Sequence, residues 1–387
     1  METVKAEPAE LFSLKDLRPL LETPGPCVSV YLPLSSAPNQ QGSKLNQLEW
    51  KELVASASEK ADDQADKART LLKSIGNIEE LTDGAPNWAK AVAVLRSEDT
   101  QRIVYLHETV QARADFGPCF YVRPLLPEAI KPSVFYVLAL SQKNVRLLRC
   151  TLDSSEEVPI GANATTSYDE YMNSTKPDHA SIKRGTAGMA SGSSKGVVGT
   201  TTSELERKDE YLRHFFKQID AGVGEVLRGK TDPLVPVGVE YELPIYAAAN
   251  TYPHIVEEGV RGAANGLKAG EMHARAIEAV ANHYERKLDA ALAEYDHKAG
   301  GGASNRLKDI VTAAHDGRVV TLIVSDSVEA PGTFNEETNR ATGERNGGGQ
   351  DLINDAVVQT ITHSGNVLVA TTKKMPNGAP AVAIFRY

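Results

Sequence analysis

Residues 305–324 read NRLKDIVTAAHDGRVVTLIV and contain the signals that decide the fold of the C-terminal part of the chain. Apolar side chains recur at helical spacing at Leu307, Ile310, Val311 and Ala314. Asp316-Gly317 ends this helix, because an aspartate followed by a glycine favours a turn. The β-branched run from Val319 to Val324 is typical of a strand covered on both faces. The stretch therefore predicts a helix followed by a buried strand.

The residues after this strand continue the alternation of helices and strands. A second helix is expected from Leu352 to Ile361, and further strands from Val367 to Ala370 and from Ala381 to Phe385. Pro376-Asn377-Gly378 marks the turn between the two strands. Together these elements predict a C-terminal α/β sandwich over residues 266–387.

This part of the chain resembles the third domain of archaeal and eukaryotic class-one peptide release factors and of Pelota, their ribosome-rescue relative. The resemblance lies in Asn305 to Ile310, in Asp316 to Val319 leading into Leu322-Ile323-Val324, and in the ending Gly378 to Tyr387. The chain is still more similar to the bacterial archaeo-eukaryotic release factor families, in particular to the family 3 type. The resemblance implies a multidomain protein of mixed α/β class.

Residues 131–265 are expected to form a middle domain. Two strands, Val134 to Leu140 and Val145 to Cys150, are predicted to pair as a hairpin. A helix with an apolar stripe follows a long loop at 185–203, and another strand is expected from Leu234 to Val239. A hairpin, a helix and a further strand are what the resemblance implies for a ribonuclease-H-like middle domain.

Residues 1–130 predict an N-terminal α/β domain. A long, charged, alanine-rich helix is expected from Leu48 to Ile75, and Ala91 to Leu95 is predicted to pair with Ile103 to Leu106 as a hairpin. In the release factors, the first domain decodes through an Asn-Ile-Lys-Ser motif. The nearest segment here, Gly42-Ser43-Lys44-Leu45-Asn46, does not match it, so stop-codon decoding is not expected.

The composition of the 387 residues restricts the class of protein further. A hydrophobic content of 41% can fill the cores of two or three domains. No apolar run is long enough to cross a bilayer, so a cytoplasmic location without membrane contact is expected. Cys27, Cys119 and Cys150 are too widely spaced for a disulfide framework and are expected to be buried thiols. The histidines lack zinc-ligand spacing, so neither a metal nor another cofactor is expected.

The net charge of −9 argues against an extended basic surface for duplex DNA, because neutralisation of phosphate by lysine and arginine supplies most non-specific affinity. Any contact with RNA must therefore be local. The segment from Lys176 to Thr202 has a net positive charge, since Asp178 is its only acid.

The loop at 185–203 corresponds to the place where the release factors carry a catalytic Gly-Gly-Gln triplet, just before a long amphipathic helix. It contains no glutamine, but a basic, glycine-rich loop could still reach rRNA or the phosphates of tRNA. The residues expected to bind RNA or the ribosome are Lys183, Arg184, Gly192, Lys195, Gly196 and Gly199. The competing interpretation is a plain surface loop, which the same composition also fits.

A Gly-Gly-Gln triplet does occur at Gly348-Gly349-Gln350. In the release factors, two glycines let the backbone approach the ester that joins peptide to tRNA, and the amide stabilises the developing oxyanion. The triplet here lies in the wrong part of the chain for that role. A glycine loop leading into the helix at Leu352, with Asp351 near its cap, is the favoured interpretation, so no catalytic residue is assigned.

The resemblance implies a ribosome-associated protein that binds as a tRNA mimic in rescue, hibernation or translation quality control. Its expected partner is the ribosome through rRNA, with tRNA and a translational GTPase as further candidates. The alternatives are a hydrolase of peptidyl-tRNA or RNA, and a regulatory module that does not act on the ribosome. A ribonuclease-H-type nuclease needs clustered carboxylates, and the hairpin strands Val134 to Leu140 and Val145 to Cys150 contain none. Enzymatic activity is therefore left open and is not favoured.

Overall fold

The chain divides by its internal contacts into two compact units, which we call the terminal unit and the middle unit. The terminal unit combines the residues up to 133 with those from Glu285 onward, and the middle unit runs from Val134 to Tyr284. The computed structural model describes residues 12–23, 25–34, 40–60, 65–76, 78–132, 134–161, 164–175, 201–265, 267–343 and 350–387. Within these ranges no helix is long and apolar enough to span a membrane. The division into three domains at 130 and 265 stays a prediction.

The middle unit is built on a five-stranded sheet in the order β7-β6-β5-β8-β9. Its strands are β5 (Phe135–Ala139), β6 (Arg146–Cys150), β7 (Ser155–Val158), β8 (Leu234–Gly238) and β9 (Val260–Arg261). β6 pairs antiparallel with both β5 and β7, whereas β8 pairs parallel with β5 and with β9. The predicted hairpin and the predicted strand after the helix are confirmed. The ribonuclease-H-like character of this domain stays a prediction.

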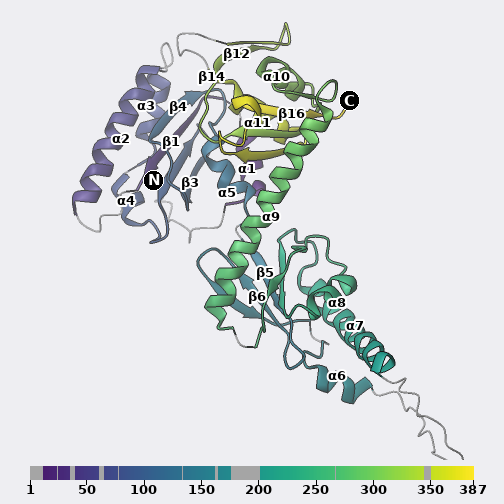
Figure 1. Cartoon of the computed structure of the whole chain (residues 1–387). Coiled ribbons are helices and arrows are strands. Elements are labelled where there is room, and N and C mark those ends of the chain that lie inside the picture. The colour runs from purple at the N-terminus through teal and green to yellow at the C-terminus, as the bar shows by residue number, and fades with distance from the viewer. Residues whose placement is uncertain are drawn as a thin grey trace, which may run out of the picture. The chain divides into compact units, whose positions relative to one another are not determined.

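Helices cover both faces of this sheet, which explains why every residue of β5 and β8 is buried. The helices are α6 (Tyr168–Thr175), α7 (Thr201–Val226), α8 (Glu242–Ala249) and the first half of α9 (Ala269–Lys298). Figure 1 shows α7 and α8 beside β5 and β6. On one face, Tyr136 and Leu138 pack with the apolar stripe of α7, and on the other, Val137 packs with Met272 and Ala276 of α9.

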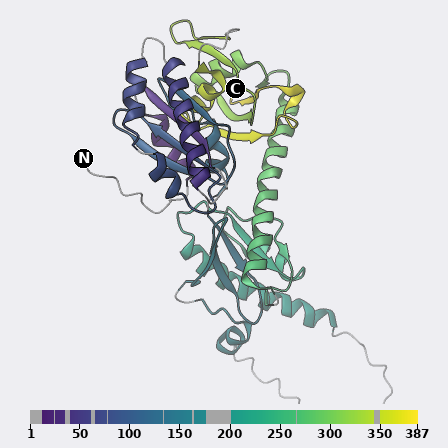
Figure 2. The ribbon, with the colours of Figure 1, turned by 90° about the vertical axis from the view of Figure 1, so that its left-hand side faces the viewer.

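The N-terminal part of the terminal unit holds an antiparallel sheet in the order β3-β2-β1-β4. Its strands are β1 (Cys27–Pro33), β2 (Ala91–Arg96), β3 (Gln101–Leu106) and β4 (Arg113–Gly117). One face is covered by α2 (Gln40–Lys60), α3 (Ala65–Lys73) and α4 (Ile78–Asp83), as Figure 2 shows for α2 and α3. The predicted hairpin of β2 and β3 is confirmed. The prediction of one helix from Leu48 to Ile75 is wrong, because α2 and α3 are separate helices.

The C-terminal part of the terminal unit is the expected α/β sandwich. Its sheet has the order β10-β16-β11-β15 and consists of β10 (Ala303–Ser304), β11 (Val319–Ser325), β15 (Asn366–Ala370) and β16 (Ala381–Phe385). β11 pairs parallel with β15 and antiparallel with β16. α10 (Leu307–His315) and α11 (Leu352–Thr362) pack on one face, and Leu288 and Tyr295 of α9 pack on the other.

A small polar sheet that the sequence did not predict joins this sandwich. It has the order β13-β12-β14 and comprises β12 (Pro331–Asn335), β13 (Arg340–Gly343) and β14 (Gln350–Asp351). These strands are short and largely exposed, so they lack the alternating apolar pattern that marks a strand in a sequence.

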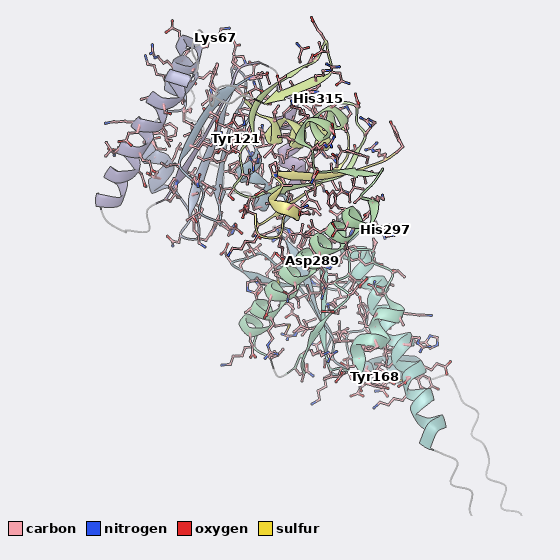
Figure 3. The ribbon with its side chains drawn as sticks, turned by 45° about the horizontal axis from the view of Figure 1, so that its top comes forward. Lys67, Tyr121, Tyr168, Asp289, His297 and His315 are labelled. Atoms are coloured by element: carbon pink, nitrogen blue, oxygen red, sulfur yellow. The ribbon has the colours of Figure 1, made fainter. Side chains whose placement is uncertain are left out.

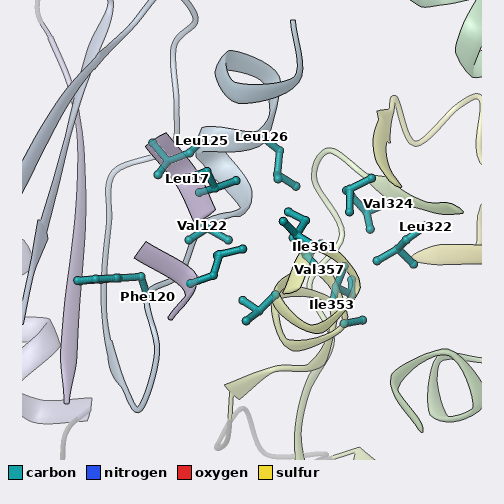
Figure 4. Close-up of a cluster of buried hydrophobic side chains, with 14 of the residues drawn as sticks. Leu17, Phe120, Val122, Leu125, Leu126, Leu322, Val324, Ile353, Val357 and Ile361 are labelled. Carbon is teal, nitrogen blue, oxygen red and sulfur yellow. The ribbon is translucent and has the colours of Figure 1, made fainter. Parts of the chain in front are cut away.

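The two parts of the terminal unit share one hydrophobic core, shown in Figure 4. The N-terminal side contributes α1 (Leu14–Leu21), the short helix Arg123–Leu125 and α5 (Leu126–Ile130). Residues labelled in Figure 4 are Leu17, Phe120, Val122, Leu125 and Leu126 from this side, and Leu322, Val324, Ile353, Val357 and Ile361 from the other. The N-terminal and C-terminal segments therefore fold as one body.

Buried polar contacts fix this joint. Asn354, which is 6% exposed, accepts a hydrogen bond from the backbone nitrogen of Val122 at 2.8 Å and donates one to the carbonyl oxygen of Phe120 at 3.1 Å. Arg123 forms an ion pair with Asp351 (Nη1 to Oδ2, 2.5 Å) and donates to the carbonyl oxygen of Ser325 at 2.7 Å. Buried polar groups with several partners of this kind hold one specific arrangement of the two segments.

Candidate functional site

The predicted RNA-binding residues lie outside the described residues. This holds for Lys183, Arg184, Gly192, Lys195, Gly196 and Gly199. The structure describes the two helices that flank them: α6 ends at Thr175 and α7 begins at Thr201. The C-terminal end of α6 and the N-terminal end of α7 lie at the same end of the middle unit (Figure 1). Residues 176–200, which we call the loop segment, therefore connect two neighbouring helix ends.

Aromatic contacts attach α6 to α7. The ring centroids of Tyr168 and Tyr171 each lie 5.6 Å from that of Phe215, which is fully buried on α7. The backbone nitrogen of Tyr168 also donates to the carbonyl oxygen of Gln142 at 2.8 Å, which ties α6 to the end of the β5 strand. A loop held at both ends by a rigid scaffold is a common setting for a binding site.

The exposed face of α7 carries basic side chains near the middle of the helix. Arg213, His214 and Lys217 are exposed in these central turns, opposite the buried stripe that contains Leu212, Phe216 and Ile219. Sequence reasoning missed these residues, although the apolar stripe of α7 was recognised. The signal was available, because basic residues opposite an apolar stripe are expected on the solvent-facing side of a helix.

The central hairpin of the middle unit lacks carboxylates, and a buried glutamate lies nearby. β5 and β6 carry no acid, and Glu242, at the start of α8, is a buried carboxylate that accepts a hydrogen bond from Gln142 at 3.2 Å. Burial raises the pKa of Glu242, and the Gln142 hydrogen bond and the charge of Lys208 oppose that shift. Among the described residues, no group of three histidines, cysteines or acids is placed to hold a metal ion.

The three cysteines are thiols in apolar surroundings. Cys27 and Cys150 are buried and Cys119 is half-buried, and each is free. Burial raises the pKa of Cys27 and of Cys150 to about 12 and that of Cys119 to about 11. The thiolate, which is the nucleophilic form, is therefore disfavoured at all three positions. The prediction of buried thiols is confirmed for Cys27 and Cys150.

The Gly-Gly-Gln triplet leads into a helix, as the favoured interpretation predicted. Gly348 and Gly349 lie outside the described residues, and Gln350 is an exposed residue of β14 that pairs with Gly332. Asp351 is the N-cap of α11, and its Oδ1 accepts hydrogen bonds from the backbone nitrogens of Ile353 at 3.2 Å and Ala330 at 3.1 Å. The prediction that Asp351 caps the helix at Leu352 is confirmed.

Replacing Gln350 by alanine is expected to change the free energy of unfolding by no more than about 0.5 kcal/mol, because its side chain is exposed. Ribosome binding should also be unchanged, since the triplet is interpreted here as a helix-start loop. Urea unfolding and ribosome pelleting measure the two quantities. A large loss of binding by a folded variant would restore the catalytic interpretation of the triplet.

Residues 134–318 match the model of bacterial archaeo-eukaryotic release factor family 3. This match covers just under half of the chain and shows what these residues are similar to. The match includes the whole middle unit, with β5 to β9, α6 to α8 and the loop segment, and it continues through α10 to Arg318. The resemblance drawn from the sequence is thus confirmed. No curated protein matches the chain.

A comparison with solved structures finds translation factors at low sequence identity and low TM-score. An archaeal translation termination factor, aRF1, is 12% identical, with coverage of 98% of this chain and 100% of that one and a TM-score of 0.24. Dom34 of S. cerevisiae, a translation termination-like factor, is 10% identical over 77% of this chain and 73% of its own, with a TM-score of 0.37. Archaeal Pelota, from a ribosome-bound model with ABCE1, is 13% identical. The match covers 100% of this chain and 99% of the Pelota chain, with a TM-score of 0.35.

Proposed function

We propose that this chain is a ribosome-associated protein that binds as a tRNA mimic in rescue, hibernation or translation quality control. The observation that carries the proposal is the family match, which covers the entire middle unit with its loop segment. The ribosome is the proposed partner through its rRNA, and tRNA and a translational GTPase are further proposed partners. Stop-codon decoding is not part of the proposal, because no decoding motif was found at 42–46.

In the proposed binding mode, the loop segment between α6 and α7 contacts the phosphates of rRNA or tRNA. Lys183, Arg184 and Lys195 supply positive charge, and the glycines expose backbone N–H groups that can donate to phosphate oxygens. Arg213 and Lys217 on the exposed face of α7 extend this charge. Because the chain as a whole carries a charge of −9, the contact is confined to this end of the middle unit.

Binding is favoured over hydrolysis by the chemistry of the middle unit. The loop segment contains no glutamine to position a water molecule on an ester. Two-metal hydrolysis of RNA needs several carboxylates at one place, and β5 and β6 carry none. A peptidyl-tRNA or RNA hydrolase stays the alternative function, without a specific observation in its favour.

Separation of a cell lysate on a sucrose gradient tests the proposed association. We expect the protein to sediment with ribosomal particles at low salt and to shift toward the top of the gradient as the salt concentration rises, since contacts with phosphate weaken with salt. A protein found only in the top fractions, at low salt as well as at high salt, would support the regulatory module that does not act on the ribosome.

A further inference from the structure

A cavity of about 490 Å³ lies within the terminal unit. Its walls come from both parts of this unit: residues 21–23 and 118–119 on the N-terminal side, and α10, β12 and α11 on the C-terminal side. The volume falls within the range of about 300–1,000 Å³ that is typical of sites for small molecules or side chains. The cavity is therefore large enough for a specific ligand.

A fixed pair of side chains forms the polar part of its wall. His315 of α10, labelled in Figure 3, donates from Nε2 to Oδ2 of Asp355 on α11 at 2.8 Å, and the two side chains are 16% and 19% exposed. The His315 ring also stacks on Phe334 of β12, with centroids 3.7 Å apart and planes 12° apart. Asp355 is thus held in place while its carboxylate borders the cavity.

The charges around the cavity are negative. Glu22, Glu336 and Asp355 border it, and among the described residues that form its walls there is no lysine or arginine. The thiol of Cys119, also in the wall, reflects this potential: burial raises its pKa to about 11, and the charge of Asp355 contributes to the shift. A phosphate or a carboxylate would be repelled here, whereas a cation would be attracted.

We propose that this cavity binds a guanidinium or alkylammonium group, either as an arginine or lysine side chain of a polypeptide or as a small free amine. Carboxylates pair with such groups through charge-assisted hydrogen bonds, and the planar guanidinium can do so with two bonds at once. Phe334 provides an apolar surface for the alkyl part of the same side chain. This proposal does not depend on ribosome binding.

Calorimetric titration of the full chain with N-acetyl-arginine amide tests the proposal. The uncharged citrulline analogue, which has nearly the same shape, is the matched ligand control. We expect the arginine compound to bind with an affinity that falls as salt is added. The citrulline compound should bind at least about fivefold more weakly, because one charge contact is lost. Equal binding of the two compounds, or no binding of arginine amide up to about 10 mM, would overturn the proposal.

Variants locate the binding at the cavity. Glu336→Gln should weaken binding about fivefold, and Glu22→Gln combined with it should weaken binding further. Both side chains are exposed at the rim, so these variants should fold. Glu337→Gln removes the same charge one residue away, outside the cavity wall, and should leave the affinity unchanged. Equal effects of the Glu336 and Glu337 changes would show that only general charge matters and would contradict the proposal.

A peptide with two arginines separated by a glycine distinguishes a polypeptide ligand from a small free amine. Binding of this peptide more than about tenfold tighter than arginine amide would identify a polypeptide segment as the ligand. Similar affinities would identify a small free amine. Either result supports a cation site, because both ligands use the same charged group.

Discussion

Replacing Asp351 by alanine is expected to lower the free energy of unfolding by about 3–5 kcal/mol. The Arg123 and Asp351 side chains are 6% and 3% exposed and are joined at 2.5 Å, so the change leaves the guanidinium buried without its counter-charge. The same carboxylate also caps α11 and accepts the backbone nitrogen of Ala330, and both contacts are lost. The effect is large because Asp351 stabilises a helix end and the joint between the two parts of the terminal unit.

Urea unfolding followed by circular dichroism measures this effect. The matched control is Asp309→Ala, which removes an exposed carboxylate from the first turn of α10 and should cost no more than about 1 kcal/mol. Asp351→Asn keeps a capping group, so its loss of unfolding free energy should lie between those of Asp351→Ala and Asp309→Ala. Combining Asp351→Asn with Arg123→Met should recover part of the lost stability, because no buried charge is left unpaired. If Asp351→Ala lowered the free energy of unfolding by less than about 1 kcal/mol, the stabilising role of the buried Arg123–Asp351 ion pair would be contradicted.

Much of the fold could be predicted because its central strands are apolar on both faces. β5, β8 and β11 are short and mostly apolar, and most of their residues are buried whichever face of the strand they lie on. α10 and α11 were also located to within one residue, since each has a clear apolar stripe and a glycine or aspartate at its boundary. Local patterns are sufficient for elements of this kind.

The packing of the N-terminal and C-terminal segments as one unit could not be predicted in the same way. It depends on contacts such as the Asn354 hydrogen bonds to Phe120 and Val122, which join residues more than two hundred positions apart. Asn354 lies within α11, and the sequence around it has no feature that identifies its partner. The polar sheet β12 to β14 was missed for a related reason, because its strands are exposed and have no apolar side to recognise.

The candidate site was partly visible in the sequence. The loop segment stands out by its glycines and its basic balance, and its position before α7 follows from the helix pattern. Arg213 and Lys217 could have been recognised from the apolar stripe of α7, because residues opposite such a stripe face solvent. The cavity of the terminal unit could not have been found, since its walls come from segments that are brought together only by the shared core.

Deleting residues 185–200 is expected to weaken ribosome binding by about tenfold or more, because it removes Lys195 and the backbone N–H groups of the glycines. The deletion stops before α7 begins at Thr201. If a short Gly-Ser linker replaces the deleted residues, the melting temperature should stay within a few degrees of that of the unaltered chain. The reason is that the entropy of loop closure changes slowly with loop length. Reversing the charges of Lys183, Arg184 and Lys195 should act in the same direction and should reduce the dependence of binding on salt.

A matched control separates local recognition from net charge. Lys67, Arg69 and Lys73 lie on α3 in the terminal unit and are exposed, and reversing them changes the total charge of the protein by the same amount. If the loop segment makes the contact, this control should bind ribosomes nearly as well as the unaltered chain. Equal losses in the two triple variants would indicate general electrostatic attraction instead of a defined contact.

Pelleting of the purified protein with ribosomes at two salt concentrations tests the central claim most directly. We expect the unaltered chain to pellet at low salt, to pellet less at high salt, and to remain in the supernatant at both concentrations when residues 185–200 are deleted. Undiminished pelleting of the deletion variant would show that the loop segment is a passive insertion. Absence of the unaltered chain from the pellet at both concentrations would contradict the proposed function itself.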